Sequence, residues 1–351
     1  MKMSYPKISF VIAIIFLSFA LVLTGCTRIE KADRLNANES DLAIGEPKVL
    51  TIYNGRQEKF IIPMVERFEQ QTGIKVNLIS GKATEYAHRI VEEKENTQAD
   101  VFLSNDAGIL EYLRLENMLA PIDKDTLKVV PENYRAKDGT WVGVTVRCRV
   151  FIYNKNLIKV EDMPKSIFDL VDPKYKDQFT MNRAGNESMV TYFASIRSII
   201  GPEKTLELLK GIMANKPLIL QSHTEVRRAV GSGEAKFGLV NNYHYKMQLL
   251  EEGMNNVGII FPDQGEGEIG AFSNVSGVAI TKYGKHPKNA LNLIQFLLQP
   301  EQQKLNDETP IIPGIEGVEY DEYKAANTSL SNVGPYWQET IELMEKAGYS
   351  D

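Results

Sequence analysis

Between residues 49 and 119, short apolar segments alternate with segments that have a helical apolar face. VLTIYNG (49–55) is rich in strand-forming residues and ends at a glycine. FIIPMVERFEQQTG (60–73) places four apolar residues at helical spacing: Ile61, Met64, Val65 and Phe68. Two more strand–helix pairs follow, IKVNLIS with TEYAHRIVEEKEN and ADVFLSND with AGILEYLRLENML. This alternation predicts an α/β fold with a parallel sheet and right-handed crossovers.

A second α/β unit follows over residues 150–272, after a long β-rich stretch, WVGVTVRCRVFIYNKNL. That stretch is expected to cross from one unit to the other, and AFSNVSGVAITKYG (271–284) to return. We therefore predict two α/β lobes with a hinge and an interlobe cleft. The first lobe comprises residues 47–146 and 274–351, and the second comprises residues 147–273. Open α/β sheets bind ligands at the carboxyl ends of their strands.

The N-terminus predicts export. Lys2 and Lys7 precede the apolar run ISFVIAIIFLSFALVL, which ends in the sequence LTGC. A basic start, an apolar run and small residues are typical of a secretory signal peptide, here residues 1–25. LTGC resembles the lipobox of bacterial lipoproteins, which implies that Cys26 carries a lipid anchor. An uncleaved membrane anchor is the alternative, although the run is short for a span of ~20 residues. Residues 26–46 have mixed charge and predict a flexible tether.

Composition excludes some classes of function. The formal net charge is −6, and it is more negative without Lys2 and Lys7, so we expect no nucleic-acid partner. Cys148 is the remaining cysteine once Cys26 is lipidated, which leaves no intrachain disulfide. The sequence contains no G-x-S-x-G, H-E-x-x-H, C-x-x-C or Walker A motif. We therefore predict no enzyme.

Several segments together resemble the solute-binding proteins of ferric-iron ABC importers. They are LTIYNGRQEKFIIPMVERFEQQTGIKV, ADVFLSNDAGIL with LRLENMLAPI, and GEAKFGLVNNYHY. The similarity covers residues 48–315. It implies a periplasmic-binding-protein-like fold and a monomer that delivers its cargo to a membrane permease driven by an ATPase.

The resemblance also implies a ligand set. Iron-carrying members place two adjacent tyrosines after the strand that corresponds to GLVN, because ferric iron is a hard cation and phenolate supplies a charged oxygen. Tyr243 matches the first tyrosine, His244 occupies the place of the second, and Tyr245 follows. Gln57 stands where many members have a histidine. We therefore expect Fe³⁺ as the cargo, with metal ligands drawn from these four residues.

Other members hold a carbonate or phosphate beside the metal, and this chain has residues that suit such an anion. The resemblance implies anion-binding positions at Arg56, Asn105, Arg147, Gly185, Asn186, His223, Asn241 and Asn242. The same residues suit a phosphorylated sugar, a phosphonate or another anion as the cargo itself. His244 keeps that alternative open, because imidazole is a poorer ferric ligand than phenolate. A lipid-anchored hydrolase is a further alternative from another class.

Overall fold

The computed structural model describes residues 46–305, 309–312 and 322–350. The predicted signal peptide, Cys26 and the predicted tether up to residue 45 lie outside the described residues. Glu46–Asp351 forms a compact unit. Across the described ranges, no helix is both long enough and apolar enough to cross a membrane.

The first lobe is built on a mixed sheet with the order β2-β1-β3-β10-β5, and short strands β4 and β11 pair at its margins. Its strands are β1 (Val49–Asn54), β2 (Lys75–Ser80), β3 (Val101–Ser104), β4 (Leu119–Ala120), β10 (Ser273–Thr281), β11 (Thr309–Pro310) and the first half of β5 (Trp141–Asn154). β1 is parallel to both β2 and β3, as the alternating pattern predicts. The returning strand β10 lies between β3 and β5 and runs antiparallel to both.

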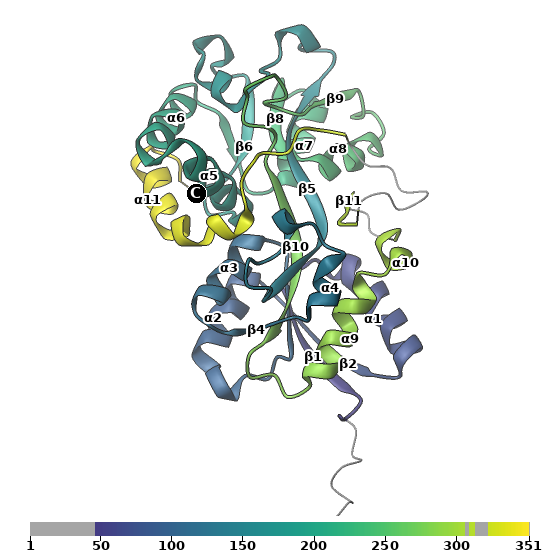
Figure 1. Cartoon of the computed structure of the whole chain (residues 1–351). Coiled ribbons are helices and arrows are strands. Elements are labelled where there is room, and N and C mark those ends of the chain that lie inside the picture. Colours follow the sequence, from purple (N-terminus) through teal and green to yellow (C-terminus); the bar gives the residue numbers. More distant parts are fainter. Residues whose placement is uncertain (1–45, 306–308, 313–321, 351) are drawn as a thin grey trace, which may run out of the picture. The chain divides into compact units, whose positions relative to one another are not determined.

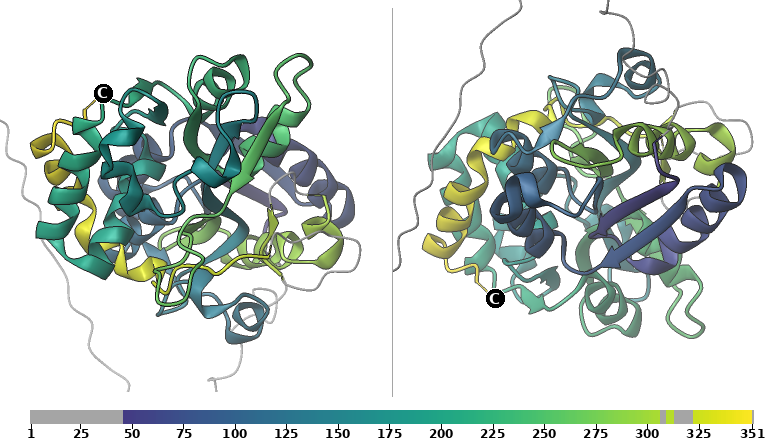
Figure 2. Two further views of the ribbon diagram at one scale, coloured as in Figure 1. Left: turned by 90° about the horizontal axis from the view of Figure 1, so that it is seen from above. Right: turned by 90° about the horizontal axis from the view of Figure 1, so that it is seen from below.

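Helices cover this sheet on two sides (Figures 1 and 2). They are α1 (Glu58–Thr72), α2 (Ala83–Glu93), α3 (Ala107–Leu115), α4 (Lys124–Lys128), α9 (Pro287–Leu297) and α10 (Pro300–Gln303). α1 and α9 contact each other on one side, and α2 and α3 contact each other on the opposite side. α1 buries Ile61, Met64, Val65 and Phe68, the face that the sequence predicts. It ends at Gly73, whose φ of 70° favours glycine.

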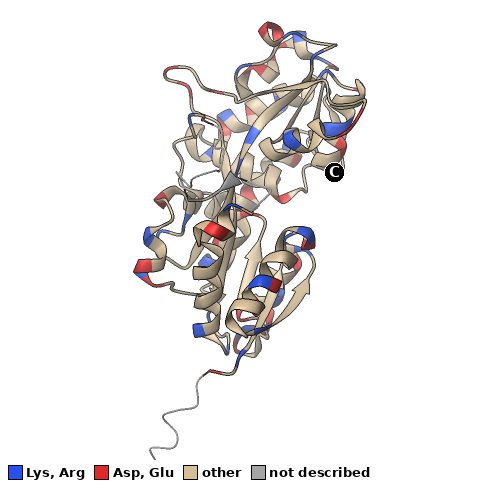
Figure 3. Ribbon diagram, turned by 90° about the vertical axis from the view of Figure 1, so that its right-hand side faces the viewer, with Lys and Arg blue, Asp and Glu red and all other residues tan. Residues whose placement is uncertain are grey.

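The second lobe has its own sheet, with the order β5-β8-β6-β7 and β9 paired to β5. Its strands are the second half of β5, β6 (Phe179–Asn182), β7 (Leu218–Leu220), β8 (Phe237–Asn241) and β9 (Val257–Ile260). Its helices are α5 (Glu187–Ile200), α6 (Pro202–Ala214), α7 (His223–Ser232) and α8 (Asn242–Leu249). Short 3₁₀ turns complete the chain at Lys94–Asn96, Glu132–Tyr134, Val160–Asp162, Ile167–Val171, Pro173–Tyr175, Leu330–Asn332 and Gly334–Tyr336. Basic and acidic residues are intermingled on the helices of both lobes (Figure 3).

Strand β5 belongs to both sheets. Its residues from Trp141 to Cys148 pair with β10, and its residues from Arg149 onward pair with β8. The Arg149 N–H donates to the Phe272 carbonyl at 2.8 Å, so the outgoing and returning strands are bonded at the exchange. The long β-rich stretch therefore crosses between lobes, as predicted.

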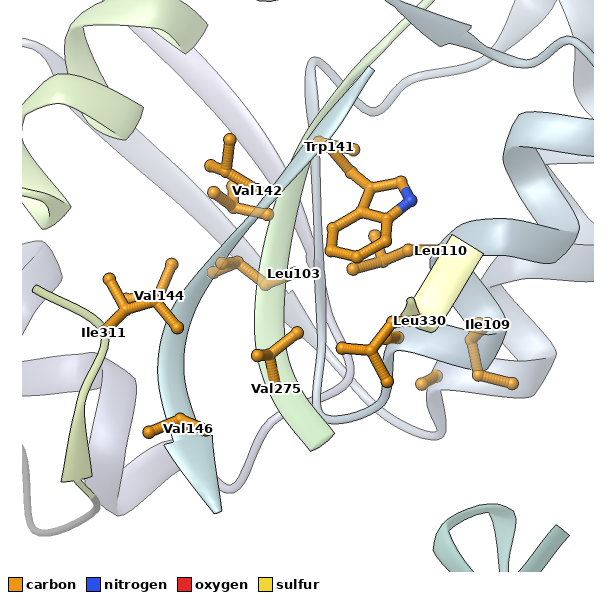
Figure 4. Close-up of a cluster of buried hydrophobic side chains, with 14 of the residues drawn as sticks. Leu103, Ile109, Leu110, Trp141, Val142, Val144, Val146, Val275, Ile311 and Leu330 are labelled. Carbon is orange, nitrogen blue, oxygen red and sulfur yellow. The ribbon is translucent and has the colours of Figure 1, made fainter. Parts of the chain in front are cut away.

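Alternation along β5 sends its side chains into separate packing layers (Figure 4). Val142, Val144 and Val146 lie on one face, and Trp141 lies on the other face with Leu110. The buried Trp141 indole N–H donates to Glu111 Oε1 at 2.6 Å, which gives this polar atom a partner inside the core. Cys148 is fully buried in a smaller apolar cluster of the second lobe, and its thiol donates to the Arg149 carbonyl at 3.6 Å.

The C-terminal helix α11 (Trp337–Lys346) contacts α5 and α6, which are helices of the second lobe (Figure 1). The buried Tyr349 ring lies 6.0 Å from that of Phe193, and its hydroxyl donates to the Asn182 carbonyl. This placement differs from the prediction that residues 274–351 belong to the first lobe. The reason is that the apolar face of α11 finds its burial on α5, after the chain has left the first sheet.

Candidate functional site

A cavity of about 160 Å³ lies where the carboxyl ends of strands from both sheets meet. Gln57 and Asn105 reach it from the first lobe, after β1 and β3. The remaining lining residues lie within β5, at the end of β8, or after β6, β7 and β8: Arg147, Asn241, Asn186, Glu187, Ser188, Ser222, His223, Thr224, Tyr243 and His244. The cavity therefore draws polar side chains from both lobes into one small space.

The N-termini of several helices point to this cavity. Among the lining residues, Gln57, Asn186, Ser222 and Asn241 are the N-cap residues of α1, α5, α7 and α8. Helix N-termini carry partial positive charge and free N–H groups, so they attract anions. Asn186 uses its side chain to cap, accepting from the Ser188 N–H at 3.1 Å. Gln57 and Asn241 make no side-chain cap bond, which leaves their amides available to a ligand.

Arg149 lies beneath the cavity wall and is almost fully buried. Its Nη1 lies 3.0 Å from His223 Nε2, and its Nη2 donates to the Ser188 carbonyl at 2.9 Å. Burial lowers the pKa of Arg149 to about 10, so it stays charged at neutral pH. An arginine only donates hydrogen bonds, so His223 Nε2 must accept and the ring must be neutral. Burial and the Arg149 charge hold the pKa of His223 well below its usual value, in agreement with this assignment.

His244 is a second buried, neutral imidazole in the same cavity. Its side chain is only 5% exposed, and burial followed by the Arg227 charge lowers its pKa to about 3. Its ring centroid lies 4.2 Å from that of Tyr243 and 5.4 Å from that of His223. His244 Nδ1 is buried and has no hydrogen-bond partner among the described residues. A neutral imidazole beside a phenol is chemically able to bind a metal without first losing a proton.

A buried carboxyl, Asp106, follows the lining residue Asn105 in the first lobe but does not itself line the cavity. Asp106 caps α3 and accepts from the Thr191 hydroxyl of α5 at 2.5 Å, a hydrogen bond between the lobes. Burial raises the pKa of Asp106 to about 6, although the Arg147 charge opposes this shift. Arg147 itself donates to Ser276 Oγ at 3.0 Å. Asn105 Oδ1 is buried without a hydrogen-bond partner in the described part of the chain.

The structure brings together most of the residues that the sequence singled out. The cavity is lined by Gln57, Asn105, Arg147, Asn186, His223, Asn241, Tyr243 and His244. Arg56, Gly185, Asn242 and Tyr245 do not line it.

Each of these four residues has another place. Arg56 is buried, and its backbone N–H donates to the Asn54 side chain at 3.0 Å. Gly185 lines a neighbouring cavity of about 470 Å³. The Asn242 side chain accepts from the Cys148 N–H at 3.1 Å. Tyr245 packs on the apolar cluster around Cys148, because α8 already includes Tyr243 and a helix turns residue i+2 away from residue i.

Sequence reasoning missed several lining residues: Glu187, Ser188, Ser222 and Thr224. The segment SHTE carries a capping-box pattern, which could have identified Ser222 as the N-cap of α7. Within the described residues, no three His, Cys, Asp or Glu side chains are grouped closely enough to hold a metal by themselves. A metal here would therefore need the phenol of Tyr243 or a bound anion as well.

Comparison with known proteins places this arrangement in context. Residues 63–330 match the family described as bacterial extracellular solute-binding protein. The chain is 35% identical to "Iron uptake protein A1" of Synechocystis, covering 87% of this chain and 88% of that relative.

Solved structures give the same picture. The ferric binding protein from Campylobacter jejuni superposes with a TM-score of 0.79 at 29% identity, over 86% of this chain and 99% of that one. The Trichodesmium protein IdiA (FutA), solved with iron and citrate ligands, gives a TM-score of 0.78 at 28% identity, over 86% of this chain and 100% of its own. The two-lobe fold of this chain is thus that of periplasmic binding proteins.

Proposed function

The chain belongs to the bacterial extracellular solute-binding proteins, and from this premise we propose that it captures ferric iron between its two lobes. The observation that carries the proposal is the pair of Tyr243 and neutral His244, with ring centroids 4.2 Å apart in the interlobe cavity. Relatives named for iron uptake and ferric binding support the same cargo.

In this proposal the second lobe provides the principal metal ligands. Tyr243 binds as phenolate, after losing a proton from a group whose ordinary pKa is ~10. His244 binds through a ring nitrogen that is already unprotonated. Gln57 and Asn105 face the cargo from the first lobe. Tyr245 is left out, because it packs on the apolar cluster of the second lobe.

An anion such as carbonate or phosphate completes the complex. The cap residues Asn186, Ser222 and Asn241, with Arg147 and His223, offer N–H groups and positive charge around the cavity. The Trichodesmium relative was solved with both iron and citrate, which supports an anionic companion here too.

The cellular role follows from the family. Its members act outside the cytoplasm and bind their solute without transforming it. We propose that this chain is a monomer, is tethered to the membrane through lipid on Cys26, and delivers iron to an ABC permease and its ATPase.

The test is a titration of the full-length protein with ferric citrate in mild detergent. The visible absorbance spectrum is recorded at each addition. We expect a phenolate-to-iron charge-transfer band that is absent from the Tyr243→Phe variant. Tyr153→Phe, which changes a tyrosine outside the cavity, is the matched control and should keep the band. A wild-type protein that takes up no iron would refute the proposal.

The helix N-termini and Arg147 favour a second candidate, a receptor for a phosphorylated sugar or a phosphonate. The iron titration, combined with thermal unfolding in the presence of such an anion, separates the two. Thermal stabilisation by such an anion, together with no band for iron, would make the anion the cargo.

A further inference from the structure

We propose that Glu187 supplies a carboxylate oxygen to the ferric ion, beside the phenolate of Tyr243 and the imidazole of His244. This inference rests on the proposed function and adds to it a metal ligand that the sequence comparison did not indicate. It makes the cargo site a mixed carboxylate, phenolate and imidazole site.

The position of Glu187 is the first argument. It is the first residue of α5, directly after the cap residue Asn186, and its side chain lines the cavity with Tyr243 and His244. These three residues all belong to the second lobe, so one lobe presents them together. Among the described residues that line the cavity, Glu187 is the only Asp or Glu.

The second argument concerns the partners of this carboxylate, whose charge also favours the N-terminus of α5. The N-terminus of α5 is already capped by Asn186, and no hydrogen bond or ion pair of the Glu187 carboxylate occurs within the described ranges. Glu225, in the first turn of α7, differs, because it accepts from the Gln221 N–H at 2.9 Å. Glu187 is half-buried and lines the cavity. Its carboxylate is therefore placed to meet a cation held there.

Charge balance is the third argument. Around the cavity, Arg147, Arg149 and the helix N-termini all contribute positive charge, and a ferric ion adds three more positive charges. Tyr243 offers one negative charge and neutral His244 offers none. A hard cation favours anionic oxygen, so a second charged oxygen ligand is required before the anion joins. Because the described His and acidic side chains form no group of three that could hold a metal, Glu187 must act with the phenolate.

The experiment compares wild type, Glu187→Gln and Glu345→Gln as full-length proteins in mild detergent. Ferric citrate is titrated while free citrate competes, and the visible band is recorded at saturation. Glu345 lines the neighbouring cavity with Glu187 but not the cargo cavity, so it is the matched control for removing a nearby charge. Thermal unfolding without iron checks that each variant is folded.

We expect Glu187→Gln to bind iron at least about tenfold more weakly, since even outer partners of metal ligands cost that much. Its band should remain but move to longer wavelength, because an iron with fewer anionic donors accepts phenolate electrons more readily. Glu345→Gln should match wild type in both respects.

The outcomes separate this inference from the proposed function. If wild type and Glu187→Gln bind iron equally and show the same band, the role of Glu187 is overturned and ferric capture stays intact. A folded wild-type protein without iron binding would overturn both. If Glu187→Gln were unfolded, Glu187→Asp, which keeps the charge on a shorter side chain, should show a smaller loss and a smaller shift. An unchanged Glu187→Asp would count against the proposal.

Discussion

Replacing His244 by glutamine should change how the stability of the iron-free protein depends on pH. Burial lowers the pKa of His244 from 6.5 to about 3. The unfolded chain therefore takes up a proton on this ring as the pH falls below the ordinary value, while the folded protein does not. The free energy of unfolding of wild type must fall accordingly. For these two pKa values the loss contributed by His244 between about pH 8 and about pH 5 is about 2 kcal/mol.

The wild-type curve alone does not isolate this effect, because Asp106 acts in the opposite direction. Its pKa is raised from 3.8 to about 6, so the folded state binds this proton first and gains stability as the pH falls through that range. The comparison is therefore made between two proteins, the Glu46–Asp351 unit with His244→Gln and the same unit unchanged. Subtracting their free energies of unfolding at each pH removes the Asp106 contribution. As the pH falls from about 8 to about 5, we expect the free energy of unfolding of the variant to rise by about 2 kcal/mol relative to that of wild type.

The assay is urea unfolding followed by far-ultraviolet circular dichroism at each pH, without iron. His88→Gln is the matched control for the substitution itself, since His88 is exposed on α2. A His244→Gln difference that is independent of pH would mean that His244 protonates in the folded protein. That result would refute the argument that it is a neutral imidazole ready to bind a metal.

Two further predictions concern individual aromatic residues. Tyr245→Phe should leave the ferric charge-transfer band unchanged, because Tyr245 packs on the apolar cluster around Cys148; a weakened band in the titration above would contradict this placement. Trp141→Phe removes the buried indole donor to Glu111 and should lower the free energy of unfolding by about 1–3 kcal/mol in urea. Trp337→Phe, at a partly exposed position, is its control and should cost less.

The framework of the first lobe could be predicted because its signals are local. Each strand of the 49–119 segment is followed by a helix whose apolar face repeats at helical spacing, and the residues on the face of α1 are the ones that are buried. The position of α11 could not be predicted in this way. Its apolar face indicates a helix but not a partner, and only the packed structure selects α5.

The site could be predicted as far as strand ends determine it. Gln57 follows β1, Asn105 follows β3, and Asn241 is the last residue of β8. Their meeting at one edge therefore follows from the topology. The next residues depend on where the helix begins. α8 starts at Asn242, so Tyr243 and Tyr245 follow helical geometry and diverge, whereas strand alternation would have kept them together. Such a boundary is set within one or two residues, which sequence patterns do not resolve.

Arg149 joins the strand exchange to the walls of the cavity. Its backbone N–H bonds to Phe272 where the two connecting strands pass, and its guanidinium reaches His223 and Ser188 at the N-termini of α7 and α5. Hinged lobes rotate about a few residues at such crossings. Arg149, α5 and α7 all belong to the second lobe, so these hydrogen bonds fix the N-termini of both helices to the strand at which the lobes connect. A cargo that contacts His223 or Ser188 therefore meets side chains held by the arginine next to the exchange.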